Sequence, residues 1–299
     1  MSIGYAEMEA VYGANQSFVA RVWESRTKYL VGAVCLVIAT IMLLPLLASL
    51  TASIKSTGEA AAVPPTYIPQ SFSLDSYLKL WSYQSGLPTY LFNSFTTAFL
   101  TIAFSLGLTV PAAYALARFP IPGKELLFVF LLLALIIPYQ ALLTPIFLMF
   151  AQLKLTNTLV GLAIIHTAIQ LPFSLYIMRN SFEAVPKELE EAAVIDGCST
   201  FQVLWKICLP SVVPAMITVA LFAFITSWNE FLGALVMMNR DATFTLPLIL
   251  AATRTATSQG GTDWGLLQAG VTVSIIPCVG VYLLLQKYYV SGLLNGAVK

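Results

Sequence analysis

Long apolar stretches without a single charge alternate with short polar segments along this chain. An α-helix needs about 20 apolar residues to cross the hydrocarbon core of a bilayer, which is about 30 Å thick. Each uncharged stretch is long enough for one crossing. We therefore predict six membrane-spanning helices, at residues 30–54, 91–117, 126–149, 158–178, 212–236 and 266–286.

Two of these helices need comment. The first starts near the N-terminus, as a signal peptide does, but its apolar core is too long and no convincing small-residue cleavage site follows it. We treat it as a retained helix. In the fourth, His166 and Gln170 interrupt the apolar run, so its limits are the least well defined.

The overall composition agrees with a membrane protein. Hydrophobic residues make up 58% of the 299 residues and charged residues only 10%. A typical soluble domain has about 25% charged and roughly 45–50% apolar residues. A soluble protein with the composition of this chain could not keep its apolar surface away from water. The net charge of +1 offers no basic surface for nucleic acid. We predict an all-α, polytopic membrane protein.

Six spans place both termini on the same side of the membrane. Cytoplasmic segments of membrane proteins are enriched in Lys and Arg. With the N-terminus inside, ten basic residues are cytoplasmic and five are external, so we predict that both termini are cytoplasmic. The ten are Arg21, Arg26, Lys28, Arg118, Lys124, Arg179, Lys187, Lys206, Lys287 and Lys299, and the five are Lys55, Lys79, Lys154, Arg240 and Arg254.

This topology divides the chain into segments. A cytoplasmic N-terminal segment spans 1–28, the six-helix membrane domain 29–287, and a cytoplasmic tail 288–299. The external loop at 55–90 is rich in proline and aromatic residues, which favours an extended segment with a short interfacial helix. This loop and the external segment at 239–265 are candidates for contact with a soluble partner, or simple connectors.

The cytoplasmic loop at 180–211 holds five of the fourteen acidic residues and is organised as two short helices. Pro186 suits the first turn of the first helix, and Gly197 can adopt the left-handed conformation that ends it. Ser199 and Gln202 fit a capping box that opens the second helix. The spacing predicts a helix–turn–helix across the cytoplasmic face of the membrane.

The chemistry of this loop favours a protein partner. The second helix carries one apolar stripe, formed by Phe201, Leu204, Trp205 and Cys208. An amphipathic connector that rests on lipid headgroups is the alternative, but an acidic surface suits anionic lipid poorly. We therefore favour docking of a partner on this loop.

The same loop resembles the EAA motif of ABC-importer permeases. Glu191, Ala192 and Ala193 are followed by Gly197, and after nine residues by Ile207 and Leu209-Pro210. In that family the loop is the coupling helix that inserts into a cleft of the cytoplasmic ATPase. The resemblance implies an ATPase-docking set of Glu191, Ala192, Ala193, Asp196, Gly197, Ile207, Leu209 and Pro210.

Other segments resemble the carbohydrate-uptake branch of these permeases. They are Ala113–Arg118, Pro172-Phe173, Trp228–Phe231, Thr245–Pro247 and Gly296–Lys299. Cys198 stands where the family more often has Ala, and it is also a small residue. The resemblance implies a type I ABC-importer fold, with this chain as the smaller permease in a bacterial cytoplasmic membrane. It also implies a second permease subunit, two ABC ATPase subunits and an extracytoplasmic solute-binding protein.

The chain itself lacks the means to bind ATP. Gly123-Lys124 is the only Gly-Lys pair, and it lacks the frame of a phosphate-binding loop. No nucleophile–base set or metal-ligand spacing appears, so we expect no metal and no cofactor, with ATP and Mg on the partner ATPases. An ion-coupled secondary transporter, which would need membrane acids and internal repeats, is a weaker alternative. A permease for a non-sugar solute stays open.

Polar residues within the predicted spans are candidates for the solute path. Glu230 is the only acid in a span, and a count of about 1.5 Å per residue from Pro214 places it near the outer interface. It either lines the outer pore or reaches interfacial water. For the other polar residues, interhelical hydrogen bonding is favoured over solute contact, and a structural hydrogen bond is favoured over proton transfer for His166. The candidate path consists of Asn93, Tyr139, Gln140, Thr144, Trp228, Asn229 and Glu230.

Overall fold

The computed structural model describes the backbone of residues 4–62, 64–253 and 262–297, and the side chains of residues 28–62, 64–253 and 262–286. The secondary-structure elements of these described residues are all helices or helical turns. The basic residues Arg21, Arg26, Arg254, Lys287 and Lys299 of the predicted topology lie outside the described side chains.

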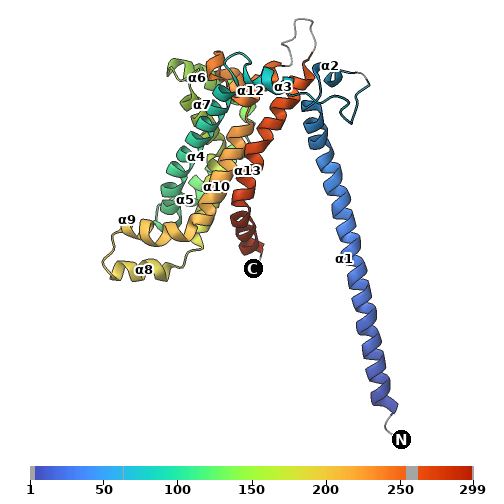
Figure 1. Ribbon diagram of the computed structural model, residues 1–299. Coiled ribbons are helices and arrows are strands. Elements are labelled where there is room, and N and C mark those ends of the chain that lie inside the picture. Colours follow the sequence, from blue (N-terminus) through green and yellow to red (C-terminus); the bar gives the residue numbers. More distant parts are fainter. Residues whose placement is uncertain (1–3, 63, 254–261, 298–299) are drawn as a thin grey trace.

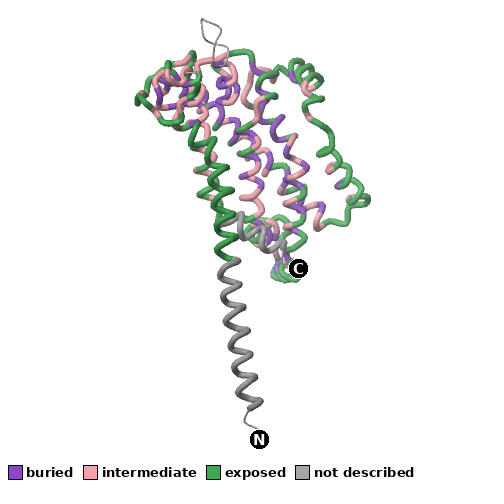
Figure 2. The backbone as a smooth tube through the Cα atoms, turned by 90° about the vertical axis from the view of Figure 1, so that its right-hand side faces the viewer, coloured by how far each residue is buried: buried purple, intermediate pink, exposed green. Residues whose placement is uncertain are grey.

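Helix α1 (Gly4–Ser53) contains the first predicted span and stands away from the other helices (Figure 1). Its segment Lys28–Ser53 is apolar on all sides and is exposed from Lys28 to Ala48 (Figure 2), whereas Ser49 and Ser53 are buried. A helix that is apolar all round needs lipid or another protein around it. Near its C-terminal end α1 approaches the bundle, where Ser49 Oγ donates to Gln268 Oε1 at 2.5 Å.

Four long helices form the bundle: α4 (Leu87–Arg118), α7 (Leu159–Glu183), α10 (Leu209–Asn229) and α13 (Trp264–Ala297). Their buried residues form two main apolar clusters, one at each end of the bundle. Tyr114, Phe182 and Val212 belong to the first cluster. Tyr90 and Trp228 belong to the second.

The third predicted span is not one straight helix. It is divided into α5 (Lys124–Leu133) with the 3-10 turn η1 (Ala134–Ile136), and α6 (Tyr139–Gln152), with a bend of 100° between the two halves. Pro138 explains the break, because the residue before a proline is driven out of the helical region. Ile137 has φ −76° and ψ 120°.

The predicted C-terminal limit of the fifth span, 212–236, is also wrong. Helix α10 stops at Asn229, Glu230 is extended, and the short helix α11 (Leu232–Met237) follows. The Glu230 carboxylate accepts hydrogen bonds from Gly233 N at 2.7 Å and Ala234 N at 3.2 Å. A side chain that satisfies the first N–H groups of a helix favours a new helix start over continuation of the old one.

The described residues contain five helices long and apolar enough to cross a membrane, and six if the bent pair counts as one span. The start of α1 and the end of α13 lie at the same end of the molecule as α8 and α9 (Figure 1). Short helices gather at the opposite end: α2 (Thr57–Ala60), α3 (Asp75–Trp81), η3 (Asp241–Thr243) and α12 (Leu246–Thr253).

The loop between α1 and α4 is more ordered than the predicted extended segment. The Glu59 carboxylate accepts hydrogen bonds from Gln70 N at 2.8 Å, Ser71 N at 3.0 Å and Ser71 Oγ at 2.7 Å. These bonds lower the pKa of Glu59 to about 2, with the Gln70 N–H as the largest cause. One carboxylate thus closes this loop upon itself.

Candidate functional site

The loop between α7 and α10 folds locally as its sequence predicts. Helix α8 (Lys187–Ile195) begins directly after Pro186, and Gly197 has φ +84°. Ser199 N donates to Gln202 Oε1 at 2.8 Å, and Gln202 N donates to Ser199 Oγ at 3.4 Å. The predicted left-handed glycine and capping box are therefore confirmed.

The second helix of the loop does not end before the membrane. Helix α9 (Thr200–Val203) continues through a π-helical turn, η2 (Leu204–Cys208), into α10. The wider turn breaks the 3.6-residue spacing on which the predicted stripe depends. As a result Cys208 is buried, whereas Phe201 and Trp205 are 68% and 55% exposed.

The loop presents acidic and apolar side chains outward. Glu191, Ala192, Asp196, Gly197 and Pro210 are exposed. Large apolar side chains beside them are at least half exposed, and we call these the loop patch: Leu189, Val194, Ile195, Phe201 and Trp205. Contiguous exposed apolar side chains rimmed by polar ones typify a protein-interaction surface.

Three members of the predicted docking set face the bundle instead. Ala193 is buried against the apolar cluster at this end, whereas Leu189 and Ala192 of the same helix are exposed. Ile207 and Leu209 are partly buried against the same cluster. These three residues hold the loop on the bundle and leave Glu191 and the loop patch free to meet a partner.

Two buried arginines at the ends of long helices fix this region. Arg118, the last residue of α4, lies 2.5 Å from Glu190 of α8 through its Nε, and its Nη2 donates to the Val185 carbonyl at 2.7 Å. Arg179 of α7 binds both oxygens of Glu125 at 2.7 and 2.8 Å. From the sequence, both arginines counted toward the charge bias and Arg118 belonged to a segment that resembles the family, but neither was expected to form a buried ion pair.

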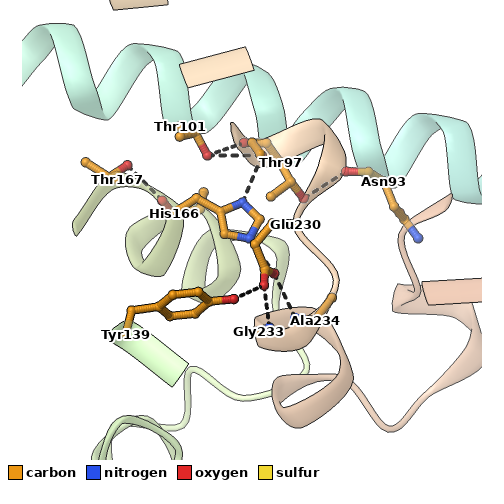
Figure 3. Close-up of polar contacts among 11 residues, drawn as sticks. Asn93, Thr97, Thr101, Tyr139, His166, Thr167, Glu230, Gly233 and Ala234 are labelled. Atoms are coloured by element: carbon orange, nitrogen blue, oxygen red, sulfur yellow. Dashed lines mark hydrogen bonds and ion pairs between the residues drawn. The ribbon is translucent and has the colours of Figure 1, made fainter. Parts of the chain in front are cut away.

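A second polar cluster lies at the other end of the bundle, around Glu230 (Figure 3). Glu230 Oε1 accepts hydrogen bonds from the Tyr139 hydroxyl and from Gly233 N. Glu230 Oε2 lies 3.1 Å from His166 Nε2 and accepts a hydrogen bond from Ala234 N at 3.2 Å. The side chain is only 7% exposed. This low exposure places the carboxylate inside the protein, which agrees neither with contact with interfacial water nor with a position on an open pore wall.

The cluster continues through His166 into the centre of the bundle. His166 Nδ1 lies 2.9 Å from Ser227 Oγ, and Thr101 Oγ1 donates to Ser227 Oγ at 3.4 Å. The prediction of a hydrogen-bonded, structural His166 agrees with this arrangement. The sequence could not show its acidic partner, which comes from the end of a different helix.

The remaining path candidates divide into two groups. Both amide hydrogens of Asn93 bind carbonyls, those of Ala242 and Phe244 at 2.9 Å, and Trp228 Nε1 donates to the Ser274 carbonyl at 3.1 Å. These two are buried and join elements within the chain. Gln140, Thr144 and Asn229 are exposed.

A cavity lies next to the bent span. It has a volume of about 550 Å³ between α5–α6 and α7. Its lining is mostly apolar, with Tyr139 and Gln140 as polar members. The bend therefore places the polar start of α6 at the edge of a hollow in the bundle.

Comparison with known proteins agrees with this architecture. Residues 106–294 match the family described as binding-protein-dependent transport system inner membrane component. The arabinooligosaccharides transport system permease protein AraQ of Halalkalibacterium halodurans is 33% identical over 264 residues, which are 88% of this chain and 93% of AraQ. The osmoprotective compounds uptake permease protein GgtD of Synechocystis is 35% identical over 271 residues, 88% of this chain and 90% of GgtD.

A solved structure shares the fold. A chain of a bacterial ABC transporter that imports the acidic polysaccharide alginate superposes with a TM-score of 0.77 and 26% identity, covering 88% of this chain and 97% of that one. The fold and the sequence similarity together define a multi-pass permease of the cytoplasmic membrane. The chain belongs to the family of inner-membrane components of binding-protein-dependent transport systems. The predicted resemblance to ABC-importer permeases is confirmed.

Proposed function

We propose that this chain forms half of the translocation pore of an ATP-driven importer for an oligosaccharide or a related polar solute. A second permease subunit completes the pore, two cytoplasmic ABC ATPase subunits bind ATP and Mg, and an extracytoplasmic protein delivers the solute. Both termini and the loop at 180–211 face the cytoplasm. The chain itself binds no nucleotide.

The observation that carries the energy-coupling part of this proposal is the surface of the loop. Glu191 is exposed, and the loop patch surrounds it with large apolar side chains. A cavity of about 390 Å³, lined by Glu190, Glu191, Val194 and Ile195 among others, hollows this face. Apolar anchors beside one carboxylate suit a cleft in an ATPase that offers apolar walls and a basic residue.

The solute class rests on the relatives. Besides AraQ, they include the diacetylchitobiose uptake permease DasC of Streptomyces coelicolor and the sulfoquinovosyl glycerol permease SmoH of Agrobacterium fabrum. These names share a sugar or a sugar-derived solute. GgtD, named for osmoprotective compounds, extends the class to related polar solutes.

Within the pore, we assign solute contact to the exposed polar side chains rather than to the buried ones. Gln140 and Thr144 lie on α6, directly after the bend, and Asn229 lies at the end of α10. Their hydrogen-bonding groups suit solute hydroxyls. Asn93, Trp228, Tyr139 and Glu230 support these elements from within the protein.

Purification of the tagged chain from its native membrane tests the assembly. We expect an ATPase, a second permease and a solute-binding protein to co-purify, and ATP hydrolysis to require the ATPase. ATP hydrolysis by the chain alone would contradict the proposal.

Uptake by cells that contain or lack the chain tests the solute class. The panel consists of arabino-oligosaccharides, diacetylchitobiose and alginate oligosaccharides, with methionine as a non-sugar control. We expect uptake of at least one sugar to depend on the chain. Dependence of methionine uptake alone would replace the sugar assignment.

A further inference from the structure

Two neighbouring carboxylates of α8 point in different directions. Glu191 is exposed on the loop surface, whereas Glu190 points to Arg118 at the end of α4, and its side chain is only 15% exposed. The Arg118 side chain is 7% exposed. Glu191 is thus available to a partner, whereas Glu190 is paired with a residue of the bundle.

Arg118 touches the loop at two separated points. Its Nε pairs with Glu190 within α8, and its Nη2 binds the Val185 carbonyl where the chain leaves α7. The guanidinium group contacts the loop through two of its nitrogens, as an ion pair with Glu190 and as a hydrogen bond to Val185, and the single ammonium group of a lysine is a poor replacement for both. Because both charges of the pair are largely buried, separation of one from the other would leave an uncompensated charge in the protein. The loop therefore cannot shift as a body unless the end of α4 shifts with it.

Helix α4 extends from this pair to the opposite face of the bundle. Close to its other end, Asn93 binds two carbonyls of the segment between α11 and α12, and Ser94 Oγ accepts from Leu246 N at 2.8 Å. The Tyr90 hydroxyl donates to Asp241 Oδ1 at 2.7 Å. A single helix thus holds the docking loop at one end and the outer segment at the other.

The second buried arginine has a different connection. Arg179 binds Glu125 of α5 and Glu183 of its own helix, and its guanidinium lies 4.2 Å from the centre of the Phe128 ring. It ties α7 to the first half of the bent span, and among the described residues its polar partners lie on α5 and α7, not on α8. Of the two, only Arg118 joins the docking loop to a pore helix.

We propose that Arg118 and Glu190 form the joint that transmits movement of the docked loop to α4 and hence to the outer end of the pore. The inference rests on the proposed function, because the movement originates in a partner ATPase. Arg118 and Glu190 are positioning residues in this scheme. They do not contact the solute, and loss of the joint separates ATPase docking from the response of the pore.

The test follows the pore by thiol labelling when the ATPase is trapped with ATP, Mg²⁺ and vanadate. A cysteine at Gln140, which is exposed at the bend, reports on the outer region through its rate of maleimide labelling. The parent chain, with Cys35, Cys198, Cys208 and Cys278 but no added cysteine, supplies the background rate. All variants are purified as the complex with the co-purifying ATPase.

We expect vanadate trapping to change the labelling rate in the complex with native Arg118 and Glu190. In Arg118→Gln and Glu190→Gln, ATPase co-purification and vanadate trapping should persist, while the change in labelling falls about tenfold, within the usual range of coupling between sites. Arg118→Lys keeps the charge but loses the contact at two points. Its change in labelling rate should lie between that of the native complex and that of Arg118→Gln. Glu188→Gln removes the same charge from the exposed side of the same helix and should keep the full response.

The outcomes separate the two proposals. If vanadate trapping changes the labelling rate as much in Arg118→Gln as in the native complex, the proposed role of the Arg118–Glu190 pair is wrong. The same holds if Glu188→Gln reduces this change as much as Glu190→Gln does. Either result would leave the importer assignment intact. Loss of ATPase co-purification in Glu190→Gln but not in Glu188→Gln would make Glu190 a docking residue and would also overturn the joint. Absence of any co-purifying ATPase with the native chain would overturn the proposed function, and the joint with it.

Discussion

At the scale of single residues, the buried carboxylate of Glu230 shows how a membrane acid is stabilised. Each of its two oxygens accepts one backbone N–H, from Gly233 or from Ala234, and each also contacts one side chain, Tyr139 or His166. A Cβ on Gly233 would lie 2.9 Å from Glu230 Oε2, so the close approach requires glycine there. Charge at this depth is tolerated because donors replace the lost water.

Replacement of Glu230 by Gln should therefore impair the protein although the shape is kept. Backbone N–H groups cannot reverse their role, so the Gln amide group would face an N–H in either orientation. An unsatisfied buried donor costs about 1–3 kcal/mol. We expect lower uptake and a lower unfolding temperature in detergent, with the chain still assembled with its partners.

Asn229→Gln is the matched control, because Asn229 is exposed and adjacent and the change keeps an amide group that can donate as Asn229 does to the Ile225 carbonyl. It should unfold at the temperature of the unchanged protein. Equal uptake and equal unfolding temperature in Glu230→Gln would mean that the groups around residue 230 do not need a carboxylate.

A second prediction at this scale concerns pH and the loop closed by Glu59. The pKa of Glu59 falls from 4.5 to about 2 because the folded loop donates hydrogen bonds to its charged form. A lowered folded pKa contributes stability that is complete above the unfolded pKa and is lost as the pH falls through the folded pKa. The amides of Gln70 and Ser71 should thus stay protected from hydrogen exchange at pH 4.

In Glu59→Gln the same two amides should exchange faster at pH 7 and at pH 4 alike. Thr66→Val removes only the hydroxyl that donates to Glu59 at 3.0 Å, and it should leave both amides protected. Equal protection in Glu59→Gln and the unchanged protein would show that the carboxylate does not order this loop.

At the scale of elements, breaks and turns of the helices place the candidate sites. Pro138 ends α5–η1 and aims α6 away by 100°. Gly197 reverses the chain between α8 and α9. In both cases one residue with special backbone requirements decides the direction of the next helix, and packing then fixes the outcome.

Gly197→Val should disturb ATPase docking. A β-branched residue at φ +84° is strained, at a cost of about 1–2 kcal/mol, while a Cβ at this position would meet no atom within 4 Å. The effect therefore comes from the backbone alone. We expect the protein to reach the membrane, to retain less ATPase on purification and to lose uptake, with a milder loss for Glu191→Ala.

Gly197→Asn is the matched control, because Asn tolerates the left-handed conformation better than other residues with a side chain. It should retain most of the ATPase. Full ATPase recovery with Gly197→Val would reduce the loop to a connector.

At the scale of the whole molecule, the sidedness follows from the same charges that divide the sequence. Among the described side chains, Lys187 of α8, Lys206 of η2 and Arg118, which pairs with Glu190 of α8, lie at the end of the molecule with α8 and α9. Lys55, Lys79 and Arg240 belong to the other end. The positive-inside bias predicts that the first end is cytoplasmic.

Reporter fusions measure this orientation directly. Fusions after Lys124 and after Ser199 should report a cytoplasmic position, and a fusion near Leu80 an external one. A fusion near Ser258, which lies outside the described residues, should also be external. A cytoplasmic signal at Leu80 would reverse the assigned sidedness, and one at Ser258 alone would remove the six-span topology.

The sequence by itself determined the membrane class, the number of apolar segments and the local form of the loop at 180–211. These properties depend on composition and on residues within a few positions of each other, as in the capping box of Ser199 and Gln202. Solvation by lipid and local backbone geometry suffice to fix them.

Only the tertiary structure decided which polar residues meet. Glu230 contacts His166, 64 positions away, and Tyr139, 91 positions away, and Arg118 reaches Val185, 67 positions away. The bend at Pro138 and the end of α10 at Asn229 bring Glu230, His166 and Tyr139 together. Such contacts depend on how helices pack and where they break, because a buried charge is stable only where distant segments supply its partners.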